Sequence, residues 1–110
     1  MRVYPNLARE TILDGINQLW VADITYVRLE REFVYLAVIL DIYSRRCVGW
    51  NLSRWLNGKL AVGALEMALE ERDIRPGLVH HSDRGVQYAS CEYTDLLLER
   101  GIRIRAYVWV

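Results

Sequence analysis

Residues 33–40 read FVYLAVIL, a run without a charged side chain that lies between the polar residues 30–32 and Asp41. Such a run, bounded by turn signals, is typical of a strand that is buried on both faces. Residues 19–29 before it are rich in β-branched and aromatic types, and residues 47–52 after it form another short strand-like segment. Because the breaks between these segments are short, they predict three consecutive antiparallel strands.

The hydrophobic period changes after residue 57. Asn57 is a favourable N-cap for a helix that we expect to end near Asp73, before the Pro76–Gly77 pair. On one side of that helix the apolar residues recur at helical spacing. They are Leu60, Ala61, Ala64, Leu65, Ala68 and Leu69.

The last third of the chain predicts a strand, a helix and a strand. Residues 78–81 form a short apolar segment, Ser90 can cap a second helix, and Gly101 stands where a C′ glycine belongs. Residues 103–110 then read as a fifth strand. Since parallel strands require crossovers, the order β-β-β-α-β-α-β predicts an α/β domain with a mixed five-stranded sheet. We expect residues 1–16 to be a leader or linker and residues 17–110 to be the domain.

The composition is that of one folded domain. The 110 residues are 53% hydrophobic, with four Trp and seven Tyr that can supply large apolar bodies to a small core. Basic and acidic residues balance at 14 each, so charge alone disfavours DNA binding unless another domain supplies affinity. Cys47 and Cys91 have no metal-ligand spacing, and no segment resembles a signal peptide or a membrane span. These features predict a soluble, intracellular protein.

Two aspartates are candidates for chemistry. Asp23 interrupts an apolar strand, where an unpaired buried carboxylate would be costly, so it is either paired or faces an open cleft. Asp83 follows the fourth strand within a Ser-Asp-Arg-Gly turn, and taken alone it reads as a turn residue. If the first and fourth strands are neighbours, the two carboxylates converge. A hard cation such as Mg²⁺ or Mn²⁺ would then be needed between them.

Asp41 and the two histidines are competing candidates. Asp41 precedes a polar turn that contains Arg45, so we expect it to cap that turn or to pair with an arginine. His80 and His81 are adjacent in a strand, where successive side chains point to opposite faces. They are therefore not expected to share a zinc ion.

Four ordered segments of the chain resemble the retroviral-integrase-like catalytic core of bacterial insertion-sequence transposases. They are WVADITY at residues 20–26, YLAVILDIYSRR at 35–46, VGW at 48–50 and HSDRGVQY at 81–88. A shorter likeness, PNL at residues 5–7, lies in the leader. The resemblance extends from about residue 5 to about residue 104.

The resemblance implies an RNase H-like fold and an Asp-Asp-Glu triad that binds two divalent cations, Mg²⁺ or Mn²⁺. By this likeness Asp23 is the first acid and Asp83 the second, both as metal ligands, and Arg84 and Gln87 are candidates to touch DNA. The implied reaction is cleavage of phosphodiesters and strand transfer between transposon ends and target DNA. The implied location is the bacterial cytoplasm, on chromosomal DNA.

The chain departs from the family pattern at its C-terminal end. The family's third acid, a glutamate on a later helix, would fall well beyond Val110, and Glu92 and Glu99 are poor substitutes. Residues 106–110 read AYVWV, unlike the family. We therefore expect a core that lacks its third acid, is inactive alone, and forms a homo-oligomer through the edge strand 103–110. The alternatives are a catalytically dead DNA-binding or regulatory remnant, and an RNase H-like nuclease.

Overall fold

The computed structural model describes residues 13–82 and 91–106. Within them the elements, in chain order, are β1 (Leu19–Arg28), β2 (Phe33–Asp41), β3 (Arg46–Ser53), α2 (Gly58–Glu71), β4 (Val79–Ser82), α3 (Cys91–Glu99) and β5 (Arg103–Ala106). The α/β class and the strand and helix order predicted from the sequence are confirmed. The predicted leader lies largely outside the described residues, as do the end of the predicted fifth strand and the cap at Ser90.

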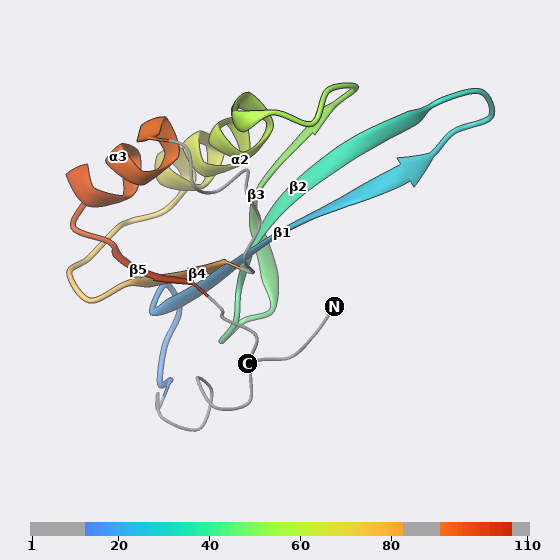
Figure 1. Ribbon diagram of the computed structural model, residues 1–110. Coiled ribbons are helices and arrows are strands. Elements are labelled where there is room, and N and C mark those ends of the chain that lie inside the picture. The colour runs from blue at the N-terminus through green and yellow to red at the C-terminus, as the bar shows by residue number, and fades with distance from the viewer. Residues whose placement is uncertain (1–12, 83–90, 107–110) are drawn as a thin grey trace.

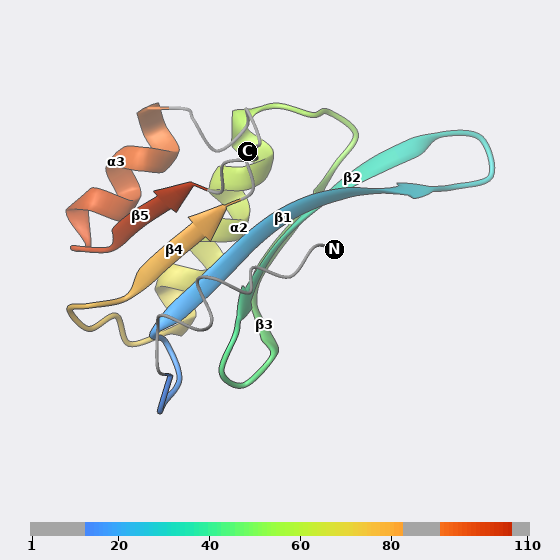
Figure 2. The ribbon, with the colours of Figure 1, turned by 60° about the horizontal axis from the view of Figure 1, so that its bottom comes forward.

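The strands form one mixed sheet. Its order is β3-β2-β1-β4-β5, in which β1 and β2 and then β2 and β3 pair antiparallel, whereas β4 pairs parallel with both β1 and β5. Figure 1 shows α2 and α3 side by side on one face of this sheet. In Figure 2 the strands of the mixed sheet fan out, and the β1–β2 hairpin projects beyond the other strands.

Helix α2 begins and packs as its sequence indicates. The Asn57 side chain accepts hydrogen bonds from the backbone N–H groups of Lys59 and Leu60, which supplies the N-cap. All six apolar residues of the predicted face are buried. The helix also lies very close to β3, because a Cβ added to Gly49 would meet the carbonyl oxygen of Ala64 at 2.1 Å. Glycine at this position is what permits the close approach.

Helix α3 ends in a Schellman motif. The N–H of Ile102 donates to the carbonyl of Leu97, and the N–H of Gly101 donates to the carbonyl of Leu98, both at 3.0 Å. Gly101 has φ of 70°, the left-handed conformation expected of a C′ glycine. Leu97 and Ile102 are both buried, so the motif directs the chain from α3 into β5 over a shared apolar contact.

The core lies between the sheet and the two helices. It includes Trp20, Ala22, Ala37 and Ile39 from the strands, and residues of α2 and α3 pack against them. A smaller cluster, in which Leu19 and Val21 are buried, occupies the opposite face of the sheet. The two faces are therefore covered unequally within the part of the chain that the structure describes.

This unequal cover corrects one expectation. The run 33–40 is not buried on both faces, because only Ala37 and Ile39 in it are buried while the alternate residues are half-buried. The physical reason is that both described helices pack on one side of the sheet. Among the described tryptophans, Trp20 is fully buried, whereas Trp50 is 48% exposed and Trp55 is 70% exposed.

None of the helices in residues 13–82 and 91–106 is long and apolar enough to cross a membrane.

Candidate active site

Asp23 lies near the middle of β1, on the sheet face opposite the helices. Successive strand residues alternate between faces, and Ala22 belongs to the helix-side core whereas Val21 belongs to the cluster on the other face. The Asp23 side chain is half-buried, and its Oδ1 accepts a hydrogen bond of 2.9 Å from the backbone N–H of Ile24. The sequence anomaly is thus a carboxylate on the less covered face, not one enclosed in the core.

The C-terminal end of β4 lies beside the middle of β1. The parallel register pairs Val21 with His81 and Ala22 with Ser82. Ser82 is the residue before Asp83 in the chain, and Ala22 is the residue before Asp23. The condition set from the sequence, that the first and fourth strands be neighbours, is therefore met. Asp83 itself lies outside the described residues, as do Arg84 and Gln87.

Asp41 caps the turn that follows it, as predicted, and it also accepts a hydrogen bond from the distant backbone before β1. It is fully buried, and its Oδ1 accepts a hydrogen bond of 2.8 Å from the N–H of Asn17. Its Oδ2 accepts from the Ser44 N–H at 2.9 Å and from the Ser44 Oγ hydroxyl at 2.6 Å. The backbone carbonyl of Asp41 accepts from the N–H of Arg45, whose φ of 62° closes the turn. This carboxylate fastens the entry of β1 to the β2–β3 turn.

The two histidines diverge, as strand alternation predicts. His80 faces the helices, where its Nε2 and the hydroxyl of Tyr93 in α3 are 2.6 Å apart. Burial lowers the pKa of His80 to about 4, opposed by a backbone hydrogen bond and assisted by the charge of His81. His80 is therefore neutral at pH 7. His81 shares its register position with Val21 and is buried on the other side of the sheet.

The contact between His80 and Tyr93 was not foreseen from the sequence. It joins β4 to α3, the two elements on either side of residues 83–90. A buried polar pair of this kind is satisfied only when both partners are present. The available signal was a tyrosine on the apolar face of the second predicted helix, which requires a hydrogen-bond partner when it is buried.

Among the described residues, no three or more His, Cys, Asp or Glu side chains gather into a group that could hold a metal ion. Asp23 is the described member of the predicted acid pair. What the geometry defines is a mixed α/β sheet with a carboxylate on β1, next to the end of the parallel strand β4. That arrangement is the one that the sequence resemblance implies for an integrase-type core.

The chain matches the family described as Integrase core domain over residues 14–107. It belongs to that family, and the sequence resemblance to insertion-sequence transposases is confirmed. It is 39% identical over 97 residues to the transposase InsF for insertion sequence IS3A of Escherichia coli (strain K12), covering 88% of this chain and 34% of the relative. It is 45% identical over 95 residues to the transposase for insertion sequence element IS629 of Shigella sonnei, covering 86% of this chain and 31% of the relative.

Solved structures share the fold. The HTLV-2 integrase catalytic core domain in complex with magnesium superposes with a TM-score of 0.69 at 17% identity, over 83% of this chain and 61% of that one. The intasome of simian T-cell lymphotropic virus, in complex with PP2A regulatory subunit B56 gamma, gives a TM-score of 0.74 at 22% identity, over 89% of this chain and 35% of that one. The RNase H-like prediction is thereby confirmed. The chain is an integrase core domain segment that spans about a third of the length of the curated relatives it matches.

Proposed function

We propose that Asp23 and Asp83 are two metal-binding carboxylates of a DNA strand-transfer site that acts on transposon ends and target DNA. The observation that carries the proposal is the register of β1 and β4, which pairs the two residues directly before these acids. Covalent geometry keeps the Cα of Asp83 about 3.8 Å from that of Ser82, and neighbouring strands lie about 4.8 Å apart. These spacings support the proposal that the two carboxylates share one site.

The donor set fits Mg²⁺ or Mn²⁺. Both ions prefer oxygen ligands, and a half-exposed strand carboxylate such as Asp23 can offer one without the cost of full burial. Two such cations, when bound, would activate a water or a DNA 3′-hydroxyl for in-line attack and stabilise the leaving oxygen. In this scheme Asp23 and Asp83 bind the cations and transfer no proton. Arg84 and Gln87 are the proposed contacts to DNA.

Metal titration tests the acid pair directly. Mn²⁺ binding to the whole chain would be measured by electron paramagnetic resonance for the wild type, Asp23→Asn, Asp83→Asn and the double variant. Each single variant should weaken binding by about tenfold or more, since loss of an outer-shell partner alone costs about 10–100-fold. The double variant should bind Mn²⁺ only slightly more weakly than either single variant, because the two residues bind at one site. Glu66→Gln, which removes an exposed acid on α2, is the matched control.

Unchanged Mn²⁺ affinity in both single variants would contradict the assignment and favour a DNA-binding or regulatory remnant. A nicking assay with Mn²⁺ on duplex DNA and on RNA–DNA hybrid separates the remaining possibilities. We expect the 110-residue chain on its own to join no DNA strands in Mg²⁺, because the positioning of two ions needs three acids and the described residues bring no group of three together. Cleavage of the hybrid alone would favour the nuclease alternative.

We also propose that the chain forms a homo-oligomer through its C-terminal edge strand. In the described sheet β5 is an outer strand, and an unpaired edge is a template for pairing with another chain. Light scattering at micromolar concentrations, with and without residues 106–110, tests this. A monomer unaffected by the deletion would contradict it.

The cytoplasm, where chromosomal DNA is present, remains the proposed location.

A further inference from the structure

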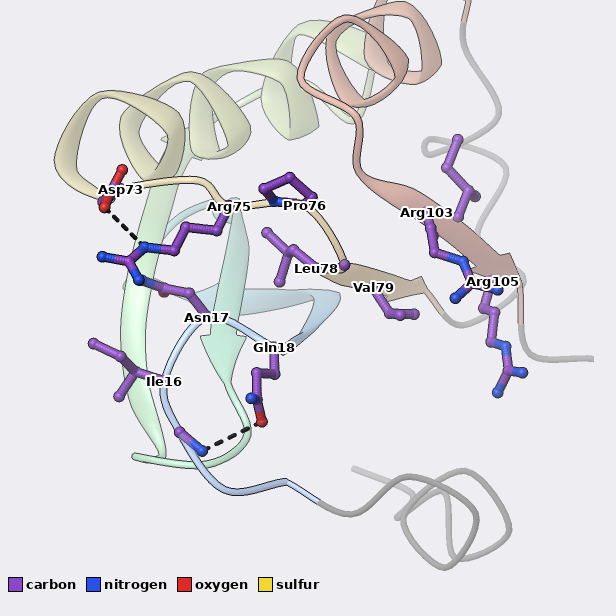
Figure 3. Close-up of a pocket in the computed structure, with 13 residues that line it drawn as sticks. Ile16, Asn17, Gln18, Asp73, Arg75, Pro76, Leu78, Val79, Arg103 and Arg105 are labelled. Atoms are coloured by element: carbon purple, nitrogen blue, oxygen red, sulfur yellow. Dashed lines mark hydrogen bonds and ion pairs between the residues drawn. The ribbon is translucent and has the colours of Figure 1, made fainter.

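A cavity of about 790 Å³ opens where β1 begins and the α2–β4 connection ends. Figure 3 shows its lining residues, which are 15–18, 73, 75–79 and 103–105. Three arginines line it, Arg75, Arg103 and Arg105, against one aspartate, Asp73. The chain as a whole has no net charge, so this cavity is a local concentration of positive charge.

Two of these arginines are not neutralised. Arg75 pairs with Asp73 at 3.2 Å, which accounts for the acid of the lining. Within the described residues, neither Arg103 nor Arg105 takes part in an ion pair or a side-chain hydrogen bond. Both are exposed. In Figure 3 their side chains project from the same side of β5, away from the helices. Two solvated guanidinium groups on one strand are able to bind anions.

The register places these two arginines on the same face of the sheet as Asp23. Arg103 pairs with Val79, which pairs with Leu19, and Arg105 pairs with His81, which pairs with Val21. Asp23 is the next residue of β1 on this same face. The two arginines therefore occupy consecutive rows of the face, about 6.6 Å apart along the strand, and the following row contains Asp23. They lie about two strand spacings, or about 10 Å, to the side of β1.

We propose that Arg103 and Arg105 bind successive backbone phosphates of a DNA strand and lead it along this face toward Asp23. The inference rests on the proposed function, since it assumes that DNA reacts at the acid site. The row spacing is comparable to that of neighbouring phosphates along one strand, and guanidinium groups bind phosphate through paired hydrogen bonds. Such contacts set position and affinity without reading sequence.

The test is equilibrium binding of a fluorescent duplex oligonucleotide in EDTA, so that it does not depend on bound metal. The variant is Arg103→Gln/Arg105→Gln in the full chain. Near 0.1 M salt the variant should bind about tenfold or more weakly. The plot of log K against log salt should become shallower by about 1.8, which is the loss of two phosphate contacts at about 0.9 each.

The control is Arg28→Gln/Arg31→Gln, which removes the same charge from the exposed β1–β2 hairpin. It should change affinity and slope much less. Arg103→Lys/Arg105→Lys should restore the slope, which excludes misfolding as the cause. Equal losses in the two glutamine variants, wild-type binding by Arg103→Gln/Arg105→Gln, or no binding by the wild type would each overturn the proposal. If Asp23→Asn leaves the Mn²⁺ affinity unchanged while the arginine variant still weakens DNA binding, the metal-site proposal is wrong and the DNA-contact proposal is retained.

Discussion

The two faces of the sheet are built from the same strands but differ in what they carry. On the helix-covered face, residues such as Trp20, Ala22 and Ile39 are almost completely buried. On the other face the alternate residues include Asp23, and Trp50 is half-exposed beside Val38, its partner in β2. Adjacent residues of one strand can therefore differ in role, because one packs in the core while the next lies on the less covered face, where a ligand can reach it.

A matched pair of tryptophans offers the largest test of this comparison. Trp20→Ala removes a fully buried ring whose Nε1 donates to Asn17 Oδ1, and we expect it to cost about 3–5 kcal/mol of unfolding free energy. Trp50→Ala, at a position 48% exposed, should cost no more than about 1 kcal/mol. Urea denaturation followed by circular dichroism measures both. Similar losses would show that the second face is as firmly packed as the first.

His80 gives an intermediate effect that depends on pH. Its pKa is about 4 in the folded chain against an ordinary 6.5, so the unfolded chain binds more protons between these values. The contribution of His80 to the free energy of unfolding is therefore fully present above pH 6.5, and it is lost as the pH falls toward 4. The difference is on the order of 3 kcal/mol, at about 1.4 kcal/mol per pKa unit.

The measurement compares urea unfolding of the wild type and His80→Gln at pH 7, 5.5 and 4. The wild type should lose more stability than the variant over this interval, since glutamine does not titrate. Parallel pH profiles would mean that His80 is not held neutral by its place between β4 and α3.

Gly49 tests how closely the covered face is packed. Gly49→Ala would put a methyl group 2.1 Å from the Ala64 carbonyl oxygen, and we expect the shift this forces to cost about 1–3 kcal/mol. Gly15→Ala is the control, because a Cβ there would meet its nearest neighbour at 3.9 Å. Thermal melting compares the two variants. An unchanged melting temperature for Gly49→Ala would mean that α2 can move away from β3 without loss.

Local signals were enough to predict most of the architecture. The Asn57 cap, the helical spacing of α2 and the glycine at the end of α3 act over a few residues, and each fell where the sequence indicated. Asp41 was assigned to its turn for the same reason, since Ser44 lies three residues away.

What could not be predicted depends on distant contacts. The register between Ile39 and Leu40 shifts where β3 supplies an extra residue, and no local pattern announces that bulge. The pairing of His80 with Tyr93 required knowing that α3 lies over β4. The exposure of Trp50 likewise depends on which face the helices cover, because a tryptophan in a strand reads the same on either side.

The contact between His80 and Tyr93 also has an entropic consequence. By joining β4 to α3 it fixes how far apart the two ends of residues 83–90 stand, so part of the loop-closure entropy of that segment is incurred during folding. Under the proposed function, a cation that binds Asp83 would then have less chain entropy to overcome, and its affinity would gain from preorganisation. A hydrogen bond on the buried side of the sheet would in this way influence cation affinity on the other side without touching the ion.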